Sequence, residues 1–347
     1  MKYPPLPPED LEHVLHHTGK LWEELRGQRL FITGGTGFFG MWLLESFARA
    51  NAVLGLGASA VILTRDPEKF ALKSPHLASR PDFEFIAGDI RTFPFPRGKF
   101  AYLIHAATEA SAKLNHEAPD EMLDVICAGT RHVLDFAAQA GIKKMLFTSS
   151  GAVYGHQPES LTRIPEEYSE SIPDSPSTGS AYAKGKRVAE QLCIDRARQS
   201  GYKIKIARGF AFVGPHLPLD AHFAMGNFIR DAMNGSPIKV NGDGTPFRSY
   251  LYASDLAVWL WTILINGQNG RAFNVGSDEA ISIADLAYRI GSRLGVEVRV
   301  AAAPTPGIAP ERYVPDTTRA LKELHLRAWT GLDDAIANTV RWHGRKP

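Results

Sequence analysis

Short apolar runs alternate with longer amphipathic stretches through the first two thirds of this chain. Helical periodicity marks residues 41–50, 121–140 and 182–200, whereas runs of four or five mostly apolar residues read as buried strands. Short apolar strands separated by helices of ten or more residues are typical of a parallel, doubly wound sheet. We therefore predict an α/β fold with strands at 29–33, 60–63, 83–86, 101–105, 144–148 and 203–207.

The regular alternation ends near residue 208. Beyond it, prolines and glycines break the pattern into loops, short strands and isolated helices, which predicts a smaller lobe of mixed α/β structure. We divide the chain into an N-terminal extension at 1–28 with one helix at about 8–25, a sheet domain at 29–208 with returning elements around 248–276, and the lobe at 209–247 and 277–347.

The amino-acid composition limits the classes of binding partner that we expect. An apolar content of 44% and a charged content of 22% are those of an ordinary globular protein, and a formal net charge of +2 gives no reason to expect nucleic acid or a membrane surface as partner. Residues 256–265 are too few to cross a bilayer and read as a buried helix. Cys127 and Cys193 lack metal-ligand spacing, so we expect a reduced cytoplasmic protein. We expect no metal site, because a surface helix face explains His13, His16 and His17 better.

A glycine-rich turn follows the first predicted strand and opens a helix. In Gly34-x-x-Gly37-x-x-Gly40, Gly34 permits the tight turn, Gly37 lets a pyrophosphate approach the backbone, and Gly40 lets the helix pack close to the sheet. The free N–H groups at the helix N-terminus favour bound phosphate. A glycine triplet alone is also compatible with a purely structural turn, but between strand and helix it favours a dinucleotide bound by Gly34, Thr36, Gly37, Phe38, Phe39 and Gly40.

The end of the second strand bears on the choice between NAD and NADP. An acidic residue there binds the ribose 2′-hydroxyl, whereas an arginine suits a 2′-phosphate. Thr64 stands where the acid is expected, followed by Arg65 and Asp66. Arg65 favours NADP slightly, Asp66 could serve NAD, and a solvated Arg-Asp turn explains both residues equally well.

Tyr182 and Lys186 lie four positions apart, so a helix places both side chains on one face. A nearby ammonium favours the phenolate, yet the tyrosine pKa must fall by about 3, worth about 4 kcal/mol, for the phenol to act as a base at neutral pH. Alone, this spacing also fits a half-exposed aromatic beside a solvated lysine. Ser150, two residues after the fifth predicted strand, could likewise be a simple strand-end cap.

Four motifs together resemble the extended short-chain dehydrogenase/reductases, and within them the nucleotide-sugar epimerase and dehydratase branch. The motifs are the glycine turn at 34–40, Gly88-Asp89-Ile90, Thr148-Ser149-Ser150-Gly151-Ala152-Val153-Tyr154-Gly155, and Tyr182-x-x-x-Lys186. The resemblance runs from residue 29 to the C-terminus. It implies a Rossmann sheet, a tightly bound NAD or NADP, a nucleotide-diphosphate sugar as substrate, and a homodimer formed through the helices at 121–140 and 182–200.

The resemblance also implies residue roles. Ser150 would bind the reacting sugar oxygen, Tyr182 would be the general base, and Lys186 would bind the nicotinamide ribose and lower the tyrosine pKa. The remaining implied cofactor residues are Asp89, Ile90, Ala106 and Ala107. The implied substrate residues are Asn227, Arg248 and Arg312, with Glu109 as a possible substitute acid or base; a surface salt bridge is the alternative for each arginine.

The chain departs from the family pattern at three places. Dehydratases of this branch carry an acid just after the catalytic serine or threonine, but here the positions are Gly151 and Ala152. Ala211 and Ile126 each replace a usual asparagine. The missing acids argue against a 4,6-dehydratase and the related decarboxylases. They favour a C4 epimerase, with a dehydratase or 4-ketoreductase as alternatives and a non-catalytic NAD(P) sensor as a remote one.

Overall fold

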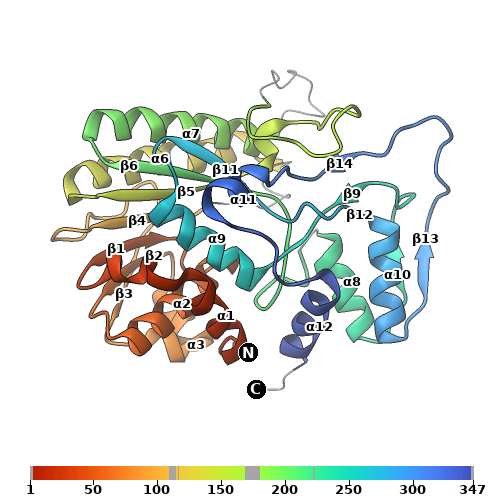
Figure 1. Cartoon of the computed structure of the whole chain (residues 1–347), viewed down its shortest axis with the longest axis horizontal. Helices are drawn as coiled ribbons and strands as arrows, with labels where there is room; N and C mark the ends of the chain where they lie inside the picture. The colour runs from red at the N-terminus through yellow and green to blue at the C-terminus, as the bar shows by residue number, and fades with distance from the viewer. Residues whose placement is uncertain (1–2, 109–114, 116, 169–179, 222, 345–347) are drawn as a thin grey trace.

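A computed structural model describes residues 3–108, 115, 117–168, 180–221 and 223–344 (Figure 1). Its centre is a seven-stranded parallel sheet in the order β11-β6-β5-β4-β1-β2-β3. The predicted doubly wound α/β fold is therefore confirmed. The strands are β1 (Arg29–Thr33), β2 (Ser59–Thr64), β3 (Phe83–Ala87), β4 (Tyr102–His105), β5 (Lys144–Ser150), β6 (Lys203–Gly209) and β11 (Arg271–Val275).

Alternation along the strands builds two cores, one on each face of the sheet. Leu30 and Ile32 pack toward α2 (Phe38–Leu54) and α9 (Ala253–Asn266), whereas Phe31 between them packs toward α6 (Pro119–Ala140) and α7 (Ala181–Ser200). Figure 1 shows α6 and α7 along one side of the sheet and α2 and α9 along the other. Between β2 and β3 lie the short helices α3 (Pro67–Lys73) and α4 (Pro75–Ala78).

The ends of the long helices follow their sequences. The Ser180 hydroxyl caps α7 by accepting a hydrogen bond from the Ala183 amide at 3.1 Å, and Gly201 ends the helix in the left-handed conformation. Helix α9 is buried from Ala253 to Ile265, as the apolar run predicts. Within the described ranges, the structure contains no helix with the length and apolar character that a membrane span requires.

The smaller lobe has its own core, to the right in Figure 1. Residues Phe228, Ile229, Ile290 and Ile336 from its helices pack together there. Its helices are α8 (Ala224–Met233), α10 (Ile283–Leu294) and α12 (Leu332–His343), and α11 (Thr318–Leu324) lies against the sheet domain. Its short strands are β7 (Phe212–Val213), β8 (Ile238–Val240), β9 (Phe247–Arg248), β10 (Leu251–Tyr252), β12 (Ile281–Ser282), β13 (Val298–Val300) and β14 (Arg312–Tyr313).

The N-terminal extension differs from the single helix expected at 8–25. Helix α1 spans Pro8–Thr18, and Gly19, with φ of 50°, ends it before a 3-10 helix, η1 (Gly19–Leu25). The helix is also less exposed than expected, because His13 Nε2 lies 2.7 Å from the fully buried Asp255 and His17 stacks on Trp329. Only His16 of the three histidines is exposed. No group of three or more potential metal-binding side chains occurs among the described residues.

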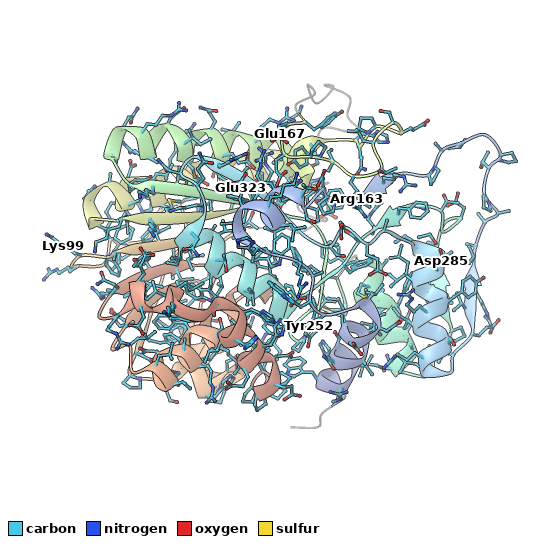
Figure 2. All side chains as sticks on the ribbon, viewed as in Figure 1. Lys99, Arg163, Glu167, Tyr252, Asp285 and Glu323 are labelled. Atoms are coloured by element: carbon cyan, nitrogen blue, oxygen red, sulfur yellow. The ribbon has the colours of Figure 1, made fainter. Side chains whose placement is uncertain are left out.

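The extension also joins elements that are distant in sequence. The Tyr252 hydroxyl donates to the buried carboxylate of Asp10 at 2.8 Å, and the Trp342 indole donates to the Pro5 carbonyl at 3.2 Å. Figure 2 labels Tyr252 near the middle of the molecule, between the sheet domain and α12. The first residues of the chain therefore bridge the sheet domain and the C-terminal helix.

We expect the Asp10→Asn variant to show a weaker pH dependence of stability than the wild type. Burial raises the pKa of Asp10 to about 6. The folded protein binds this proton more tightly than the unfolded chain, so stability present below about pH 4 is lost as pH rises through about 6. The wild type should lose up to about 3 kcal/mol more than the variant between about pH 4 and about pH 7.

Denaturant unfolding at the two pH values measures this difference. Glu68→Gln removes an exposed carboxylate of helix α3 that does not act on Asp10, and it serves as the control. Equal losses in the wild type and Asp10→Asn would contradict the assignment.

Candidate active site

A cavity of about 740 Å³ opens at the carboxyl ends of the parallel strands, where the sheet order reverses beside β1. Ligands of open α/β sheets bind in this position. Both the sheet domain and the smaller lobe contribute to its wall. The lining includes Gly34, Gly37, Phe38, Phe39, Ala106, Thr108, Thr148, Ser149, Ser150, Ala152, Tyr182, Lys186, Gly209, Phe210, Ala211, Phe212, Leu217, Pro218, Phe223, Ala224, Met225, Arg248, Tyr250, Ile283 and Tyr313.

Two of the three glycines in the Gly34-x-x-Gly37-x-x-Gly40 motif have backbone atoms where a side chain would begin. Gly34 has φ of 73°, and a Cβ on it would lie 2.5 Å from the Ala106 backbone. A Cβ on Gly40 would lie 2.2 Å from the Gly35 carbonyl carbon. At Gly37 an added Cβ would meet the Gly34 carbonyl oxygen at 3.5 Å, an ordinary contact. Gly34 and Gly40 are therefore required by the fold, whereas Gly37 lines the cavity and leaves it open.

A buried histidine supports the end of β4. His105 Nδ1 lies 2.8 Å from the Thr33 hydroxyl, and its Nε2 lies 3.2 Å from the Thr130 hydroxyl. Burial lowers the pKa of His105 to about 3, so the ring is neutral. The Thr33 oxygen in turn accepts a hydrogen bond from the Ala107 amide at 3.1 Å, which fixes the segment of Ala106 and Ala107 against the glycine turn.

The ends of β2 and β3 carry the residues expected near the adenosine. Thr36 in the glycine turn lies 3.5 Å, hydroxyl to hydroxyl, from Thr64 at the end of β2. Arg65 is exposed, and Asp66 caps α3 by accepting from the Lys69 amide at 2.8 Å. The cap gives the Asp66 carboxylate a structural role that the sequence alone did not predict.

Asp89 and Ile90 follow β3. Hydrogen bonds from the Arg91 guanidinium and backbone lower the pKa of Asp89 to about 2. Ile90 packs on Gly129 of α6, where a Cβ would lie 2.7 Å from its side chain. Neither residue lines the 740 Å³ cavity.

Ser150, Tyr182 and Lys186 meet at one end of the cavity. The Ser150 oxygen accepts from the Ala152 amide at 3.2 Å, so it does cap the 3-10 helix η2 (Gly151–Tyr154) while facing the cavity. The Lys186 ammonium lies 5.9 Å from the Tyr182 ring centre and donates to the Thr148 carbonyl at 2.8 Å. The cap and the catalytic reading of Ser150 are therefore compatible.

Burial sets the charges of these groups in the protein alone. It raises the pKa of Tyr182, and a hydrogen bond with Ser150 acts in the opposite direction. Burial lowers the pKa of Lys186, which is 1% exposed, to about 8. Desolvation therefore dominates the pKa of Tyr182, and Lys186 is not among the groups that shift this pKa in the protein alone.

Two of the predicted substrate residues lie at the cavity or next to it. Arg248 lines the large cavity, with its guanidinium 3.4 Å from the Glu311 carboxylate. Asn227 lines an adjoining cavity of about 200 Å³, and both cavities share Ala224 and Ile283. Glu109 lies outside the described residues.

Arg312 is placed differently from the sequence expectation. Its guanidinium lies over the Phe247 ring at 4.3 Å, and it is absent from the cavity lining. The next residue, Tyr313, enters the cavity instead, because neighbouring residues of a strand point to opposite faces. Sequence reasoning missed Tyr313, and the alternation would have shown that only one of the pair can face the site.

Two further positions hold α7 in place. Asn115 accepts a hydrogen bond from the Tyr182 backbone amide at 3.0 Å. Ile126, which replaces a usual asparagine, packs on Gly185, where a Cβ would lie 3.1 Å from its side chain. The Ile126 substitution therefore places an apolar contact directly beside Lys186. Ala211, the other replaced asparagine, lines the cavity.

Known proteins resemble this chain in sequence and in fold. UDP-glucuronic acid decarboxylase 1 of Arabidopsis thaliana is 28% identical over 312 residues, covering 90% of this chain and 69% of that protein. UDP-glucose 4-epimerase of Thermotoga maritima, solved with UDP-glucose, has a TM-score of 0.72 at 19% identity over 91% of this chain and 98% of its own. The dTDP-glucose 4,6-dehydratase of Streptomyces venezuelae, solved with NAD and TYD, has a TM-score of 0.74 at 23% identity over 91% and 96%.

A family model gives the assignment. The model of the NAD dependent epimerase/dehydratase family matches residues 30–276, from β1 through β11, which is most of the chain. The resemblance inferred from the four motifs is therefore confirmed at family level. The chain belongs to the NAD-dependent epimerase/dehydratase family of enzymes.

Proposed function

We propose that this protein is an NAD(P)-dependent nucleotide-sugar epimerase that acts at C4 through a transient 4-keto sugar. The observation that carries the proposal is a Ser150, Tyr182 and Lys186 group with no acid at the two positions that follow the serine. Gly151 and Ala152 offer no group for the elimination of water. Epimerisation needs only that hydride leave C4 and return to the opposite face.

The side chains supply the proton chemistry of this reaction. Gly37 and Lys186 would help to hold oxidised NAD(P), which would supply the hydride acceptor and a positive charge. Tyr182 accepts the hydroxyl proton, and Ser150 holds the same sugar oxygen by a hydrogen bond. One N–H of Lys186 is used by Thr148, so two remain for a ribose hydroxyl. Since burial raises the Tyr182 pKa, both positive charges are needed to form the phenolate.

The polar end of the substrate would lie toward the smaller lobe. The Arg248 guanidinium suits a diphosphate, because its planar fork can donate two parallel hydrogen bonds. Asn227 and the turn Gly242-Asp243-Gly244 border the adjoining cavity, where a nucleoside would fit beyond the diphosphate. We therefore propose a nucleotide-diphosphate sugar with its sugar at Ser150.

A UDP-glucuronic acid decarboxylase is the second candidate, because curated relatives at 26–29% identity carry that name. The absence of acids at Gly151 and Ala152 argues less strongly against decarboxylation than against dehydration. A 4-keto uronate is a β-keto acid, so carbon dioxide can leave without an acid beside the ketone. A proton donor is still required afterwards at C5. Dehydration, by contrast, needs a group that protonates the leaving hydroxyl.

The described residues fit a dinucleotide. Gly37 borders the cavity at the N-terminus of α2, where backbone N–H groups favour a pyrophosphate. Because the Asp66 carboxylate caps α3, Arg65 is the better candidate for contact with the cofactor ribose. An arginine there supports the slight preference for NADP. The NAD-bound dehydratase supports NAD. We propose that the protein prefers NADP to NAD.

We also propose a homodimer formed through α6 and α7. These two helices cover one face of the sheet, and α7 presents Val188 with 44% of its surface exposed.

We also propose a cytoplasmic location. Cys127 and Cys193 are both free thiols, which fits a reduced cytoplasmic protein.

The Tyr182→Phe variant should lose at least about 100-fold in kcat, because general base catalysis is removed while the ring is kept. Interconversion of UDP-, dTDP-, CDP- and GDP-sugars, followed by NMR, measures the activity. Tyr202→Phe is the matched control, since its buried hydroxyl has no hydrogen-bond partner among the described residues.

Other products would redirect the assignment. Oxidation of NADPH by a 4-keto sugar without any interconversion would identify a reductase. Release of carbon dioxide from UDP-glucuronate would identify a decarboxylase. Full activity of Tyr182→Phe would remove the enzyme mechanism altogether.

The Gly37→Ala variant should fold normally but bind the cofactor roughly tenfold more weakly. Its methyl group makes only an ordinary contact within the chain and projects where a pyrophosphate approaches. Thermal unfolding and a cofactor titration measure the two effects. Gly331→Ala, where an added Cβ meets nothing within 4 Å, is the control. Unchanged affinity would place the pyrophosphate elsewhere.

The Arg65→Ala variant should weaken binding of NADP at least about fivefold more than binding of NAD, because the guanidinium is expected to face the 2′-phosphate. Titration of each cofactor by intrinsic fluorescence measures the ratio. Lys69→Ala removes an exposed charge from the neighbouring helix as the control. A loss of equal size for both cofactors would argue for NAD.

A further inference from the structure

The phenol of Tyr313 lies near Ser150, as does that of Tyr182. Tyr313 comes from β14, which pairs in parallel with β9 so that Tyr313 lies beside Arg248. The Tyr313 hydroxyl is 3.5 Å from the Ser150 hydroxyl, and both side chains line the cavity. An oxygen atom bound by Ser150 is therefore within reach of both phenols.

Two hydrogen bonds of Val314 hold the backbone next to Tyr313. The next residue, Val314, donates its amide to the Gln157 side chain at 3.0 Å and accepts at its carbonyl from the Ile164 amide at 2.9 Å. The Tyr313 ring packs against Phe210 with ring centres 4.7 Å apart. These contacts fix the direction of the phenol before any substrate binds.

Gly151 makes the room that this phenol occupies. A Cβ at position 151 would lie 2.7 Å from the Phe210 ring and 2.8 Å from the Tyr313 hydroxyl oxygen. Both distances are shorter than real Cβ contacts, so any side chain at 151 requires these rings to move. The space beside Gly151, one of the two positions where the resemblance implies an acid in dehydratases, is thus filled by Phe210 and Tyr313.

We propose that Tyr313 is a further catalytic residue, which donates a hydrogen bond to the sugar oxygen at C4 as that oxygen becomes a ketone. The inference rests on the proposed function and extends it to a residue of the smaller lobe. In the oxidation, the hydroxyl proton passes to Tyr182 and the hydride, with its electron pair, passes from C4 to oxidised NAD(P). The C–O single bond becomes a double bond, and Tyr313 keeps its own proton throughout.

The electrostatics fit a donor and not a base. Burial raises the pKa of Tyr313, so the phenol stays protonated across the working range. The Arg248 guanidinium lies 5.9 Å from the ring centre, donates to the Phe247 carbonyl at 2.9 Å and lies 3.4 Å from the Glu311 carboxylate. A fixed, neutral hydroxyl aimed at an oxygen that gains negative character is an effective stabiliser of that state.

Ligand binding tests the proposal without requiring turnover. The wild type should bind a UDP- or dTDP-linked 4-keto-6-deoxy sugar more tightly than UDP or dTDP alone, as measured by calorimetry with the cofactor-loaded protein. Tyr313→Phe should reduce this preference about tenfold and leave the affinity for the free nucleotide diphosphate unchanged. In turnover, the same variant should lose about 100-fold in kcat with little change in KM.

Tyr102→Phe is the matched control, since it removes a phenol that donates to the Glu24 carbonyl at the opposite end of the sheet. Thermal unfolding of both variants separates a folding defect from a lost contact. If Tyr313→Phe binds the keto sugar as the wild type does, or if the wild type shows no preference for the keto sugar, the role of Tyr313 is refuted. If the preference depends on Tyr313 but Tyr182→Phe leaves turnover intact, the binding role stands and the proposed function fails.

Discussion

A lysine ammonium buried beside the cavity constrains the architecture around it. Lys186 is almost completely buried, so neighbouring protein groups must stabilise its charge. The Thr148 carbonyl accepts one hydrogen bond, and the faces of Phe147 and Tyr182 lie 4.8 and 5.9 Å from the ammonium. Meeting these needs requires α7 to lie close on β5. The small residue Gly185 permits the accompanying contact with Ile126 on α6.

The two halves of the chain contribute differently to the site. The sheet domain supplies Ser150, Tyr182 and Lys186, which lie on β5 and α7, two elements that pack in one core. The smaller lobe adds Arg248 and Tyr313 on paired two-residue strands. Under the proposed function, the sheet domain would hold the groups for proton and hydride transfer, and the smaller lobe would recognise the substrate through Arg248 and Tyr313.

Much of this arrangement could be predicted from sequence because it depends on local patterns. Apolar runs and helical periodicity located six of the seven sheet strands but not β11, and the glycine spacing located the turn whose backbone approaches Ala106. Contacts between residues far apart in the sequence were harder to predict. His13 and Asp255 are 242 residues apart, and no local sequence pattern indicates that they meet. The motif match pointed to Arg312, whereas Tyr313 lines the cavity, because a motif match does not report which face of a strand each residue occupies. The Gly19 break in the first helix depends on a positive φ that glycine permits and does not require.

The N-terminal extension lies outside the stretch that defines the family, yet it is part of the core. Val14, Trp22 and Leu25 are fully buried, and Trp22 packs on Trp261 of α9 with ring centres 4.9 Å apart. A shortened chain that begins at the family boundary would expose this apolar face of α9 to water and leave Asp255 without its histidine. Boundaries drawn from family similarity alone would therefore yield an aggregation-prone fragment, and homologues that lack such an extension need a different cover for α9.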